Sequence, residues 1–405
     1  MRGLVIINQQ YPPETAATGQ LMRGLARTMA ASERFESVRL VCGRTFYAKD
    51  SGSEFDADAV AIDKDDAENG VLVQRLWNST FPKQSLPGKL FNHLTFMLSL
   101  LFYSIDKNNT VLVTTAPPLA VVILALKKSL MLNPFDLVMS VQDLYPDVLV
   151  AAGSANANGL VCRALRAMMR RAMSACRTVA AISTDMAAHL RLMYGLEGVA
   201  VIPNPALDSV KTLPFNQEKS RRGWDGRFVV QYSGNFGAAH EYMTMLDVMR
   251  LLSGRDDILF HIAGGGSHYD ALKREAEALP NAVFEGFAPA SELSERLALA
   301  DLAVVIFDGA FRDVLLPSKY AGILASGRPV LLISGCVNDI TRDIQREGIG
   351  LCFGHGESEA IAGAIVDLAA NPHQARAMGY RARMLYDRAY YTEAAYAKYA
   401  DMLEG

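Results

Sequence analysis

The sequence offers little material for disulfide or metal chemistry. Its 405 residues include five cysteines, an odd number, and no Cys-x-x-Cys pair. The seven histidines show neither a His-x-His nor a His-Glu-x-x-His spacing. A disulfide framework needs paired cysteines and a zinc site needs clustered ligands, so both classes are disfavoured. We therefore expect no metal, no bound cofactor and a reducing compartment.

Long hydrophobic runs and charge of one sign are also scarce. The best apolar run, residues 94–105 (LTFMLSLLFYSI), would span about 18 Å as a helix, against about 30 Å of bilayer core. It predicts a buried or interfacial helix. The first residues, MRGLVIINQQ, lack the layout of a signal peptide. The net charge of −3 gives no overall attraction to nucleic acid. We expect a cytoplasmic protein without a nucleic-acid partner.

Short apolar runs, in contrast, recur along the chain and alternate with helical stretches. Continuous runs of this kind are typical of parallel strands buried on both faces. We expect strands at residues 3–8, 38–41, 71–73, 111–115, 137–141, 179–182 and 199–202, and again at 228–232, 258–262, 282–285, 302–307, 330–333 and 350–353. This order predicts an α/β fold with two doubly wound parallel sheets.

A polar stretch with two prolines, residues 204–224, separates the two sets of runs. We therefore expect an N-terminal domain over 1–204, a linker over 205–226 and a C-terminal domain over 227–385. Two Rossmann-like halves of this kind predict parallel sheets that face a central cleft, where such sheets bind ligands.

Three loops of the second half suit a diphosphate. They are residues 233–237 (SGNFG), 264–267 (GGGS) and 315–319 (LLPSK), and each follows an expected strand. Glycine lets backbone N–H groups approach an anion, and a helix start adds its positive dipole end. In the third loop we expect Ser318 to cap a helix and Lys319 to face outward. Each loop alone is as well explained as an ordinary turn, but the three together favour a diphosphate site. The glycines do not match the Gly-x-Gly-x-x-Gly spacing of dinucleotide oxidoreductases.

The first half contributes smaller signals. Thr18 and Gly19 lie in a loop of small residues after the first strand, which suits close approach of a sugar or phosphate. Asp143 follows a strand end, where a carboxylate would take an acceptor proton or stabilise positive charge on a sugar. A loop acid or a helix N-cap is the alternative for Asp143. The segment 63–65 (DKD) has an Asp-x-Asp spacing but lies in an acidic stretch, and we expect a solvated loop there.

A basic helix is expected near residues 160–177. Arg163, Arg166, Arg170 and Arg177 fall within about a 60° arc of a helical projection, with Leu165, Met168, Met169 and Ala172 roughly opposite. This pattern predicts an amphipathic helix on an anionic membrane surface. The alternative is a helix that packs its methionines on the core and leaves the arginines in water.

Several motifs, taken in order, resemble the retaining family 4 glycosyltransferases of the GT-B fold. The similarity is to the bacterial branch that builds O-antigen, capsule and exopolysaccharide on lipid carriers. It covers nearly the whole chain and rests on YPPETAATGQLMRGLA, TTAPPLA, VQDLYPDVLVAAG, VIPNP, YSGNFGAAHE, HIAGGG and LPSKYAGILASGRPVL. The resemblance implies transfer of a sugar from a nucleotide diphosphate, with UDP expected, to a polyprenyl-diphosphate-linked glycan. It also implies a peripheral enzyme on the inner face of the plasma membrane.

The resemblance also assigns residues. The donor site would comprise Gly234, Asn235, Gly237, His240, Gly264, Gly265, Phe287, Ser318 and Lys319. Thr18 and Gly19 would lie on the acceptor side, with Asp143 near the reacting centre. A C-terminal helix over 386–405 is expected to return to the N-terminal domain. One departure is that Val314 and Gly322 stand where many members carry a Glu-x7-Glu pair. Charge neutralisation then falls on Lys319 and on backbone N–H groups.

Two other functions remain open. A sugar-nucleotide 2-epimerase shares the two-domain architecture but should carry several acids and a histidine around the anomeric carbon, and this chain offers few. A catalytically silent binding subunit is suggested by the missing glutamate pair. Incubation with nucleotide sugars and lipid-linked acceptors separates the three functions, because each gives a different product.

Overall fold

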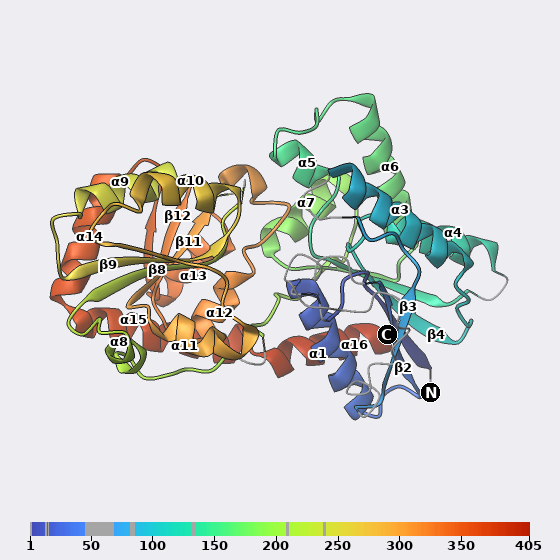
Figure 1. Cartoon of the computed structure of the whole chain (residues 1–405). Helices are drawn as coiled ribbons and strands as arrows, with labels where there is room; N and C mark the ends of the chain where they lie inside the picture. Colours follow the sequence, from blue (N-terminus) through green and yellow to red (C-terminus); the bar gives the residue numbers. More distant parts are fainter. Residues whose placement is uncertain are drawn as a thin grey trace. The chain divides into compact units, whose positions relative to one another are not determined.

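The computed structural model describes residues 2–12, 14, 16–44, 69–81, 86–131, 134–207, 210–237 and 240–405. The chain divides into two compact units. The first comprises Met1–Pro203, Asp313–Leu315 and Ala395–Gly405, and the second comprises Asn204–Arg312 and Leu316–Ala394. Each unit contains its own parallel sheet (Figure 1).

The first unit is built on a seven-stranded sheet in the order β3-β2-β1-β4-β5-β6-β7, with every neighbouring pair parallel. The strands are β1 (Gly3–Ile7), β2 (Val38–Gly43), β3 (Val71–Leu76), β4 (Asn109–Thr114), β5 (Asp136–Val141), β6 (Thr178–Ala181) and β7 (Ala200–Val201). The strand order reverses between β1 and β4, which is the doubly wound arrangement.

Helices cover both faces of this sheet (Figure 1). They are α1 (Ala17–Ala31), α3 (Leu86–Phe102), α4 (Ala120–Leu130), α5 (Asp147–Ala151), α6 (Leu160–Ser174), α7 (Thr184–Tyr194) and α16 (Thr392–Glu404). Leu25 of α1 and Tyr399 of α16 join one buried cluster with Leu4 and Ile6 of β1. The helices α3, α4 and α6 pack side by side on the other face. Both faces of the strands are therefore buried, which explains their continuous apolar runs.

The second unit repeats the plan with six parallel strands in the order β10-β9-β8-β11-β12-β13. The strands are β8 (Phe228–Asn235), β9 (Ile258–Gly265), β10 (Ala282–Glu285), β11 (Leu302–Phe307), β12 (Val330–Ser334) and β13 (Gly350–Phe353). The helices are α8 (Gln217–Arg221), α9 (Met243–Leu251), α10 (Ser267–Ala276), α11 (Leu293–Ala298), α12 (Lys319–Ala325), α13 (Asp339–Glu347), α14 (Ser358–Ala370) and α15 (Pro372–Leu385).

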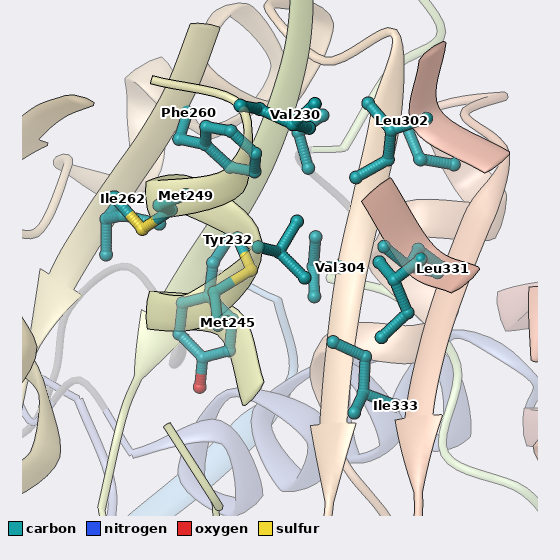
Figure 2. Close-up of a cluster of buried hydrophobic side chains, with 14 of the residues drawn as sticks. Val230, Tyr232, Met245, Met249, Phe260, Ile262, Leu302, Val304, Leu331 and Ile333 are labelled. Carbon is teal, nitrogen blue, oxygen red and sulfur yellow. The ribbon is translucent and has the colours of Figure 1, made fainter. Parts of the chain in front are cut away.

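The hydrophobic core of the second unit packs against β8, β9 and β11 and so holds the ends of these strands in place. Val230 of β8, Phe260 of β9 and Val304 of β11 meet the α9 residues Met245 and Met249 in one buried cluster (Figure 2). The Tyr232 ring belongs to the same cluster, and its hydroxyl is the polar end that projects from it. Here too the strand order reverses, between β8 and β11. Open α/β sheets bind ligands at the carboxyl ends of strands that flank such a reversal.

The α/β fold with two Rossmann-like sheets is confirmed, and each expected strand lies on an observed one. Several strands are longer than expected, and β8 and β9 in particular continue through Asn235 and Gly265. The stretch 205–226, expected as a linker, is part of the second unit and contains α8. Of the expected C-terminal helix, residues 395–405 group with the first unit and the preceding residues with the second. No helix in the described part of the chain is both long and apolar enough to span a membrane.

Candidate functional site

Paired glycines bring β8 and β9 unusually close at their carboxyl ends. Gly234 is in register with Gly264, and Asn235 with Gly265. A Cβ atom on Gly264 would lie 2.0 Å from the Gly234 carbonyl oxygen, and the φ angle of Gly264 is +140°. Only glycine combines that backbone angle with that contact. The glycines were expected to form a phosphate-binding loop. In the structure they allow β8 and β9 to approach each other closely at their carboxyl ends.

Lys319 lies directly over this edge. An added Cβ on Gly234 would be 3.7 Å from the Lys319 Nζ. The ammonium donates a hydrogen bond to the Tyr232 hydroxyl and lies 3.6 Å from the centroid of the Tyr232 ring. Burial lowers the pKa of Lys319 well below its ordinary value. Lys319 thus faces inward to the reversal point of the sheet, and not outward as expected.

The Tyr232 hydroxyl is held by a second contact. It donates to the Asn235 backbone carbonyl over 2.8 Å. Burial raises the pKa of Tyr232 far above its ordinary value, so the phenol stays neutral. One hydroxyl thus links the glycine end of β8 to the lysine. Sequence reasoning missed Tyr232. The available signal was its place as the last apolar residue before Ser233-Gly234.

An aromatic group covers the other side of the turn. The Tyr232 and Phe236 rings stack with centroids 4.2 Å apart, and the His240 ring meets the Phe236 ring edge-on at 5.6 Å. His240 also contacts the Gly237 carbonyl through Nδ1 at 3.1 Å. Burial, aided by the positive charge of Lys319, lowers the pKa of His240 to about 4. His240 is therefore neutral near pH 7, and Lys319 is the other basic side chain of this group.

Phe287 and Ser318 flank the same edge. The exposed Phe287 ring lies against Gly265, where an added Cβ would come within 2.9 Å of its Cε2. An exposed aromatic face beside a glycine strand end offers a stacking surface for a planar base. Ser318 precedes α12 and is exposed, but its side chain makes no capping hydrogen bond. The expected cap is therefore absent, and the hydroxyl points to no partner within the helix.

A polar cluster that sequence reasoning missed lies on the opposite face of β9 and β10. Glu285 pairs with Arg296 and Arg222, and its Oε2 is 3.1 Å from the His261 Nε2. Burial, with the two arginines, lowers the pKa of His261 to about 3. The Trp224 ring meets the His261 ring at 5.3 Å. The cluster anchors the strand that leads to Phe287.

Asp143 of the first unit follows β5, next to the point where that sheet reverses. Its backbone N–H donates to the Thr115 hydroxyl over 3.1 Å, and so does that of Gln142. The Asp143 side chain is exposed, and desolvation by nearby protein raises the pKa of its carboxyl to about 6. α5 begins only at Asp147, so Asp143 is not a helix N-cap. A carboxyl with this pKa can both accept and return a proton near neutral pH.

The small residues after β1 have a structural use. Gly19 is buried, and an added Cβ would lie 3.1 Å from the Gln10 carbonyl oxygen. The Thr18 hydroxyl donates to the Gln10 side chain over 2.8 Å. Both residues lie in the first turn of α1 and not in a loop as expected, and they hold the loop that leaves β1.

The expected arc of arginines does not form one exposed face. Arg166 turns inward and donates to Asp147 over 2.7 Å, and this carboxylate also accepts from the Tyr194 hydroxyl. Arg177 lies beyond the end of α6 and pairs with Asp136 at 2.6 Å. Only Arg163 and Arg170 of the four project from α6 as exposed side chains. Helical projection missed this because it does not show which side of the helix contacts the sheet.

Among the described residues, no group of three or more His, Cys, Asp or Glu side chains could hold a metal ion. The Asp63-Lys64-Asp65 segment lies outside the described residues.

A comparison with known protein families finds a match within the second unit. Residues 227–371 match the model of the glycosyl transferases group 1 family. This part of the chain is a group 1 glycosyl transferase domain. The transferase domain contains the paired glycines, Phe287 and Lys319. A curated relative, the probable glycosyltransferase WbjE of Pseudomonas aeruginosa, is 26% identical over 223 residues, which are 53% of this chain and 55% of that protein. The match thus spans about half the length of the relative.

Solved structures share the fold across the whole chain. Sucrose-phosphate synthase from Thermosynechococcus elongatus superposes with a TM-score of 0.77 at 15% identity, covering 99% of this chain and 98% of that one. Anabaena HepE in complex with UDP and glucose gives 0.67 at 14% identity, covering 100% and 99%. WaaG, a glycosyltransferase involved in lipopolysaccharide biosynthesis, gives 0.68 at 14% identity, covering 99% and 100%. The two Rossmann-like units therefore have the GT-B fold.

Proposed function

We propose that this chain is a retaining family 4 glycosyltransferase that moves a sugar from a nucleotide diphosphate, UDP in the first instance, to a lipid-linked glycan. The observation that carries the proposal is the Lys319 ammonium placed over Gly234 at the strand reversal of the transferase domain. Glycosyl transfer breaks the bond between the anomeric carbon and a phosphate oxygen. Negative charge then develops on the diphosphate, and a fixed cation beside it stabilises that charge most in the transition state.

The donor site is proposed to use backbone groups for the rest of the charge. Gly234 and Gly265 are partly exposed at the ends of β8 and β9 and carry no side chain, so their backbone groups are proposed to contact the diphosphate beside Lys319. Phe287 is proposed to stack on the base, and Ser318 to contribute a hydroxyl beside Lys319. The relative named as a probable glycosyltransferase and the HepE complex with UDP support this choice of ligand.

Asp143 is proposed as the residue closest to the acceptor chemistry. Its pKa of about 6 suits a group that takes the proton of the acceptor hydroxyl as that oxygen bonds to the anomeric carbon. Thr18 and Gly19 are proposed to shape the acceptor side through the loop they hold. The acceptor itself is proposed to be a polyprenyl-diphosphate glycan of cell-surface polysaccharide biosynthesis, at the inner face of the plasma membrane.

A panel of nucleotide sugars in a thermal-shift assay tests donor binding, because a ligand of the native state raises the unfolding temperature. We expect one nucleotide class to raise it in the wild type and not in Lys319→Ala. The matched control is Lys273→Ala on the exposed side of α10, which should keep the shift. Absence of a shift with every nucleotide sugar would contradict the donor site.

Product analysis with polyprenyl-diphosphate acceptors then tests the reaction. Glycosylated lipid with released nucleoside diphosphate is expected. Isomerised donor without acceptor product would indicate the epimerase. Donor binding without turnover for every pair would indicate a silent binding subunit.

A further inference from the structure

Helix α3 has its polarity reversed relative to a helix on the surface of a water-soluble protein. Its solvent side is apolar along the whole length, with Leu90, Leu98 and Phe102 exposed by 59%, 55% and 80%. The exposed apolar side chains of the helix recur every three or four residues, and they are Leu90, Phe91, Leu94, Leu98, Leu101 and Phe102. That spacing defines one continuous helix face.

The polar residues of α3 point the other way, into the protein. Asn92 is fully buried, and its Nδ2 donates to the Phe81 carbonyl over 3.0 Å. The Ser99 hydroxyl donates to the Trp77 carbonyl over 2.7 Å, and the His93 Nδ1 lies 2.6 Å from the Gln9 side-chain oxygen. These bonds fix the rotation of the helix about its axis. The apolar face cannot turn inward without breaking them.

Two aromatic residues extend the apolar face beyond the helix. Trp77 and Phe81 follow β3 and are exposed by 52% and 47%. The Phe81 ring meets the Phe91 ring edge-on, with centroids 5.9 Å apart. We call Trp77, Phe81 and the six exposed residues of α3 the α3 surface. It exceeds the scattered apolar residues that any soluble protein exposes, because it is contiguous along a helix of 17 residues.

The described helices around the α3 surface carry charge of one sign, and the exposed Asp106 lies four residues beyond the end of α3. The neighbouring helices α3, α4 and α6 contain no aspartate or glutamate. Lysine or arginine occurs in all three, and Arg163 and Arg171 of α6 are exposed. Two residues of α4, Leu126 and Leu130, are also exposed and continue the apolar character. An apolar face bordered by cations fits the interface of an anionic bilayer, where apolar side chains enter the acyl region and cations meet the headgroups.

We propose that the α3 surface inserts into the interface of an anionic lipid bilayer, with α3 lying in the membrane plane. A second copy of the chain is the less suitable occupant. A symmetric dimer would bring the same acid-free helices face to face, so the cations would repel each other. The proposal deepens the membrane part of the proposed function, and it replaces the arc of four arginines as the contact. It does not require that the chain transfers sugar.

Co-sedimentation of the full chain with vesicles tests the proposal. The vesicles contain one part phosphatidylglycerol to three parts phosphatidylethanolamine, and phosphatidylcholine vesicles serve as the neutral reference. The double variant Leu94→Glu/Leu98→Glu places two carboxylates on the α3 surface, and we expect it to bind at least about tenfold more weakly. The matched control Leu251→Glu/Met384→Glu changes two equally exposed apolar residues of the second unit and should bind as the wild type does.

Trp77 supplies a direct readout of insertion. Trp77 and Trp224 are the two tryptophans of the chain. In a Trp224→Phe background, we expect Trp77 emission to shift to the blue on adding the anionic vesicles and to be quenched by brominated lipids. Equal vesicle binding by the wild type and the Leu94→Glu/Leu98→Glu variant would overturn the proposal. So would a self-association of the wild type that this variant abolishes, without any vesicle binding.

The outcome is separable from that of the proposed function. The Leu94→Glu/Leu98→Glu variant should keep the thermal shift given by nucleotide sugars, because the changed residues lie in the first unit. Vesicle binding without sugar transfer would leave the α3 surface established and the activity refuted. Sugar transfer to lipid acceptors in detergent, without vesicle binding, would establish the activity and refute the α3 surface as a membrane contact.

Discussion

The Lys319 ammonium lies 3.6 Å from the centre of the Tyr232 ring and donates its hydrogen bond to the hydroxyl of the same residue. Tyr232 ends the buried part of β8, whereas Lys319 begins α12, so the contact joins two elements at the reversal point of the sheet. Among the residues that the structure describes, no carboxylate forms an ion pair with this half-buried ammonium. The diphosphate of the proposed donor would supply a negative charge there.

Tyr232→Phe removes the hydroxyl and keeps the ring. Loss of a hydrogen bond to a charged group costs about 1.5–3 kcal/mol, so we expect donor affinity to fall about 10- to 100-fold. The measurement is titration of the purified protein with the nucleotide sugar that gives the largest thermal shift. Tyr399→Phe is the control, because it removes a buried hydroxyl contact with Ser140 at 2.7 Å in the other unit. An unchanged affinity in Tyr232→Phe would show that the hydroxyl does not position Lys319.

Donor binding should take up a proton. The pKa of Lys319 is lowered in the free protein, and a bound diphosphate raises it again because the opposite charge favours the ammonium. Calorimetric titration at a series of pH values, in buffers of different ionisation enthalpy, measures this uptake. Lys319→Arg is the matched variant, because its guanidinium stays charged and should bind without uptake. The same uptake in both proteins would place the titrating group elsewhere.

Because of Asp143, we expect activity to rise and stability to fall as the pH increases. If the carboxylate accepts the acceptor proton, kcat rises as the pH passes through about 6. For stability, the folded pKa lies above the unfolded value of 3.8, so the protonated form favours the native state. This stabilisation is complete below the unfolded pKa and is lost as the pH rises through about 6. Asp143→Asn should therefore be more stable than the wild type at pH 8 and equal to it below pH 4, by urea unfolding.

The same substitution should lower kcat more than it changes the donor affinity. Asp256→Asn, at an exposed site between α9 and β9, should change neither property. A pH–rate profile that stays flat between pH 5 and 8 would remove Asp143 from the chemistry.

Gly264→Ala should damage both the fold and the donor site. A Cβ at this position would overlap the Gly234 carbonyl, and the φ angle of +140° is strained for any other residue. The two strand ends must separate, and we expect the unfolding free energy to fall by about 2–4 kcal/mol. Gly363→Ala in α14 is the control, because nothing lies within 4 Å of its added Cβ and alanine favours a helix by about 1 kcal/mol. Equal stability of the two variants would contradict the close approach of β8 and β9.

Arg166→Ala should destabilise the first unit without removing membrane binding. The Asp147 side chain is 4% exposed, and its pKa is lowered to about 2 because the neighbouring His189, Tyr194 and Arg166 side chains outweigh its burial. Removing one partner of a buried ion pair costs about 3–5 kcal/mol. The loss should be full above pH 4 and shrink as the pH falls through about 2, where Asp147 becomes protonated.

Arg163→Ala, at an exposed position of the same helix, is the control for that experiment and should stay within about 0.5 kcal/mol of the wild type. Urea unfolding measures both variants. An Arg166→Ala protein with full stability and lost vesicle binding would restore the arginine arc as the membrane contact.

The strands could be read from the chain because parallel strands buried on both faces need unbroken apolar runs. Each expected run lies on an observed strand, from Gly3–Ile7 to Gly350–Phe353. The motifs also placed Gly234, Gly264 and Lys319 in one domain, and the structure brings these three to one sheet edge. Local composition sufficed there because strand ends and turns are set by residues adjacent in sequence.

Side-chain direction could not be read in the same way. The sequence placed Lys319 on an outer surface and Arg166 on a basic face, yet the first turns toward Tyr232 and the second toward Asp147. Each partner is distant in the chain, so only the packed sheets bring the pair together. The rotation of α3 could not be predicted for the same reason, because Asn92 and Ser99 donate to carbonyl groups of the segment after β3. By itself the sequence determined where the strands lie along the chain. The tertiary structure decided which charges are buried and which apolar face is left in water, because burial depends on neighbours that folding alone supplies.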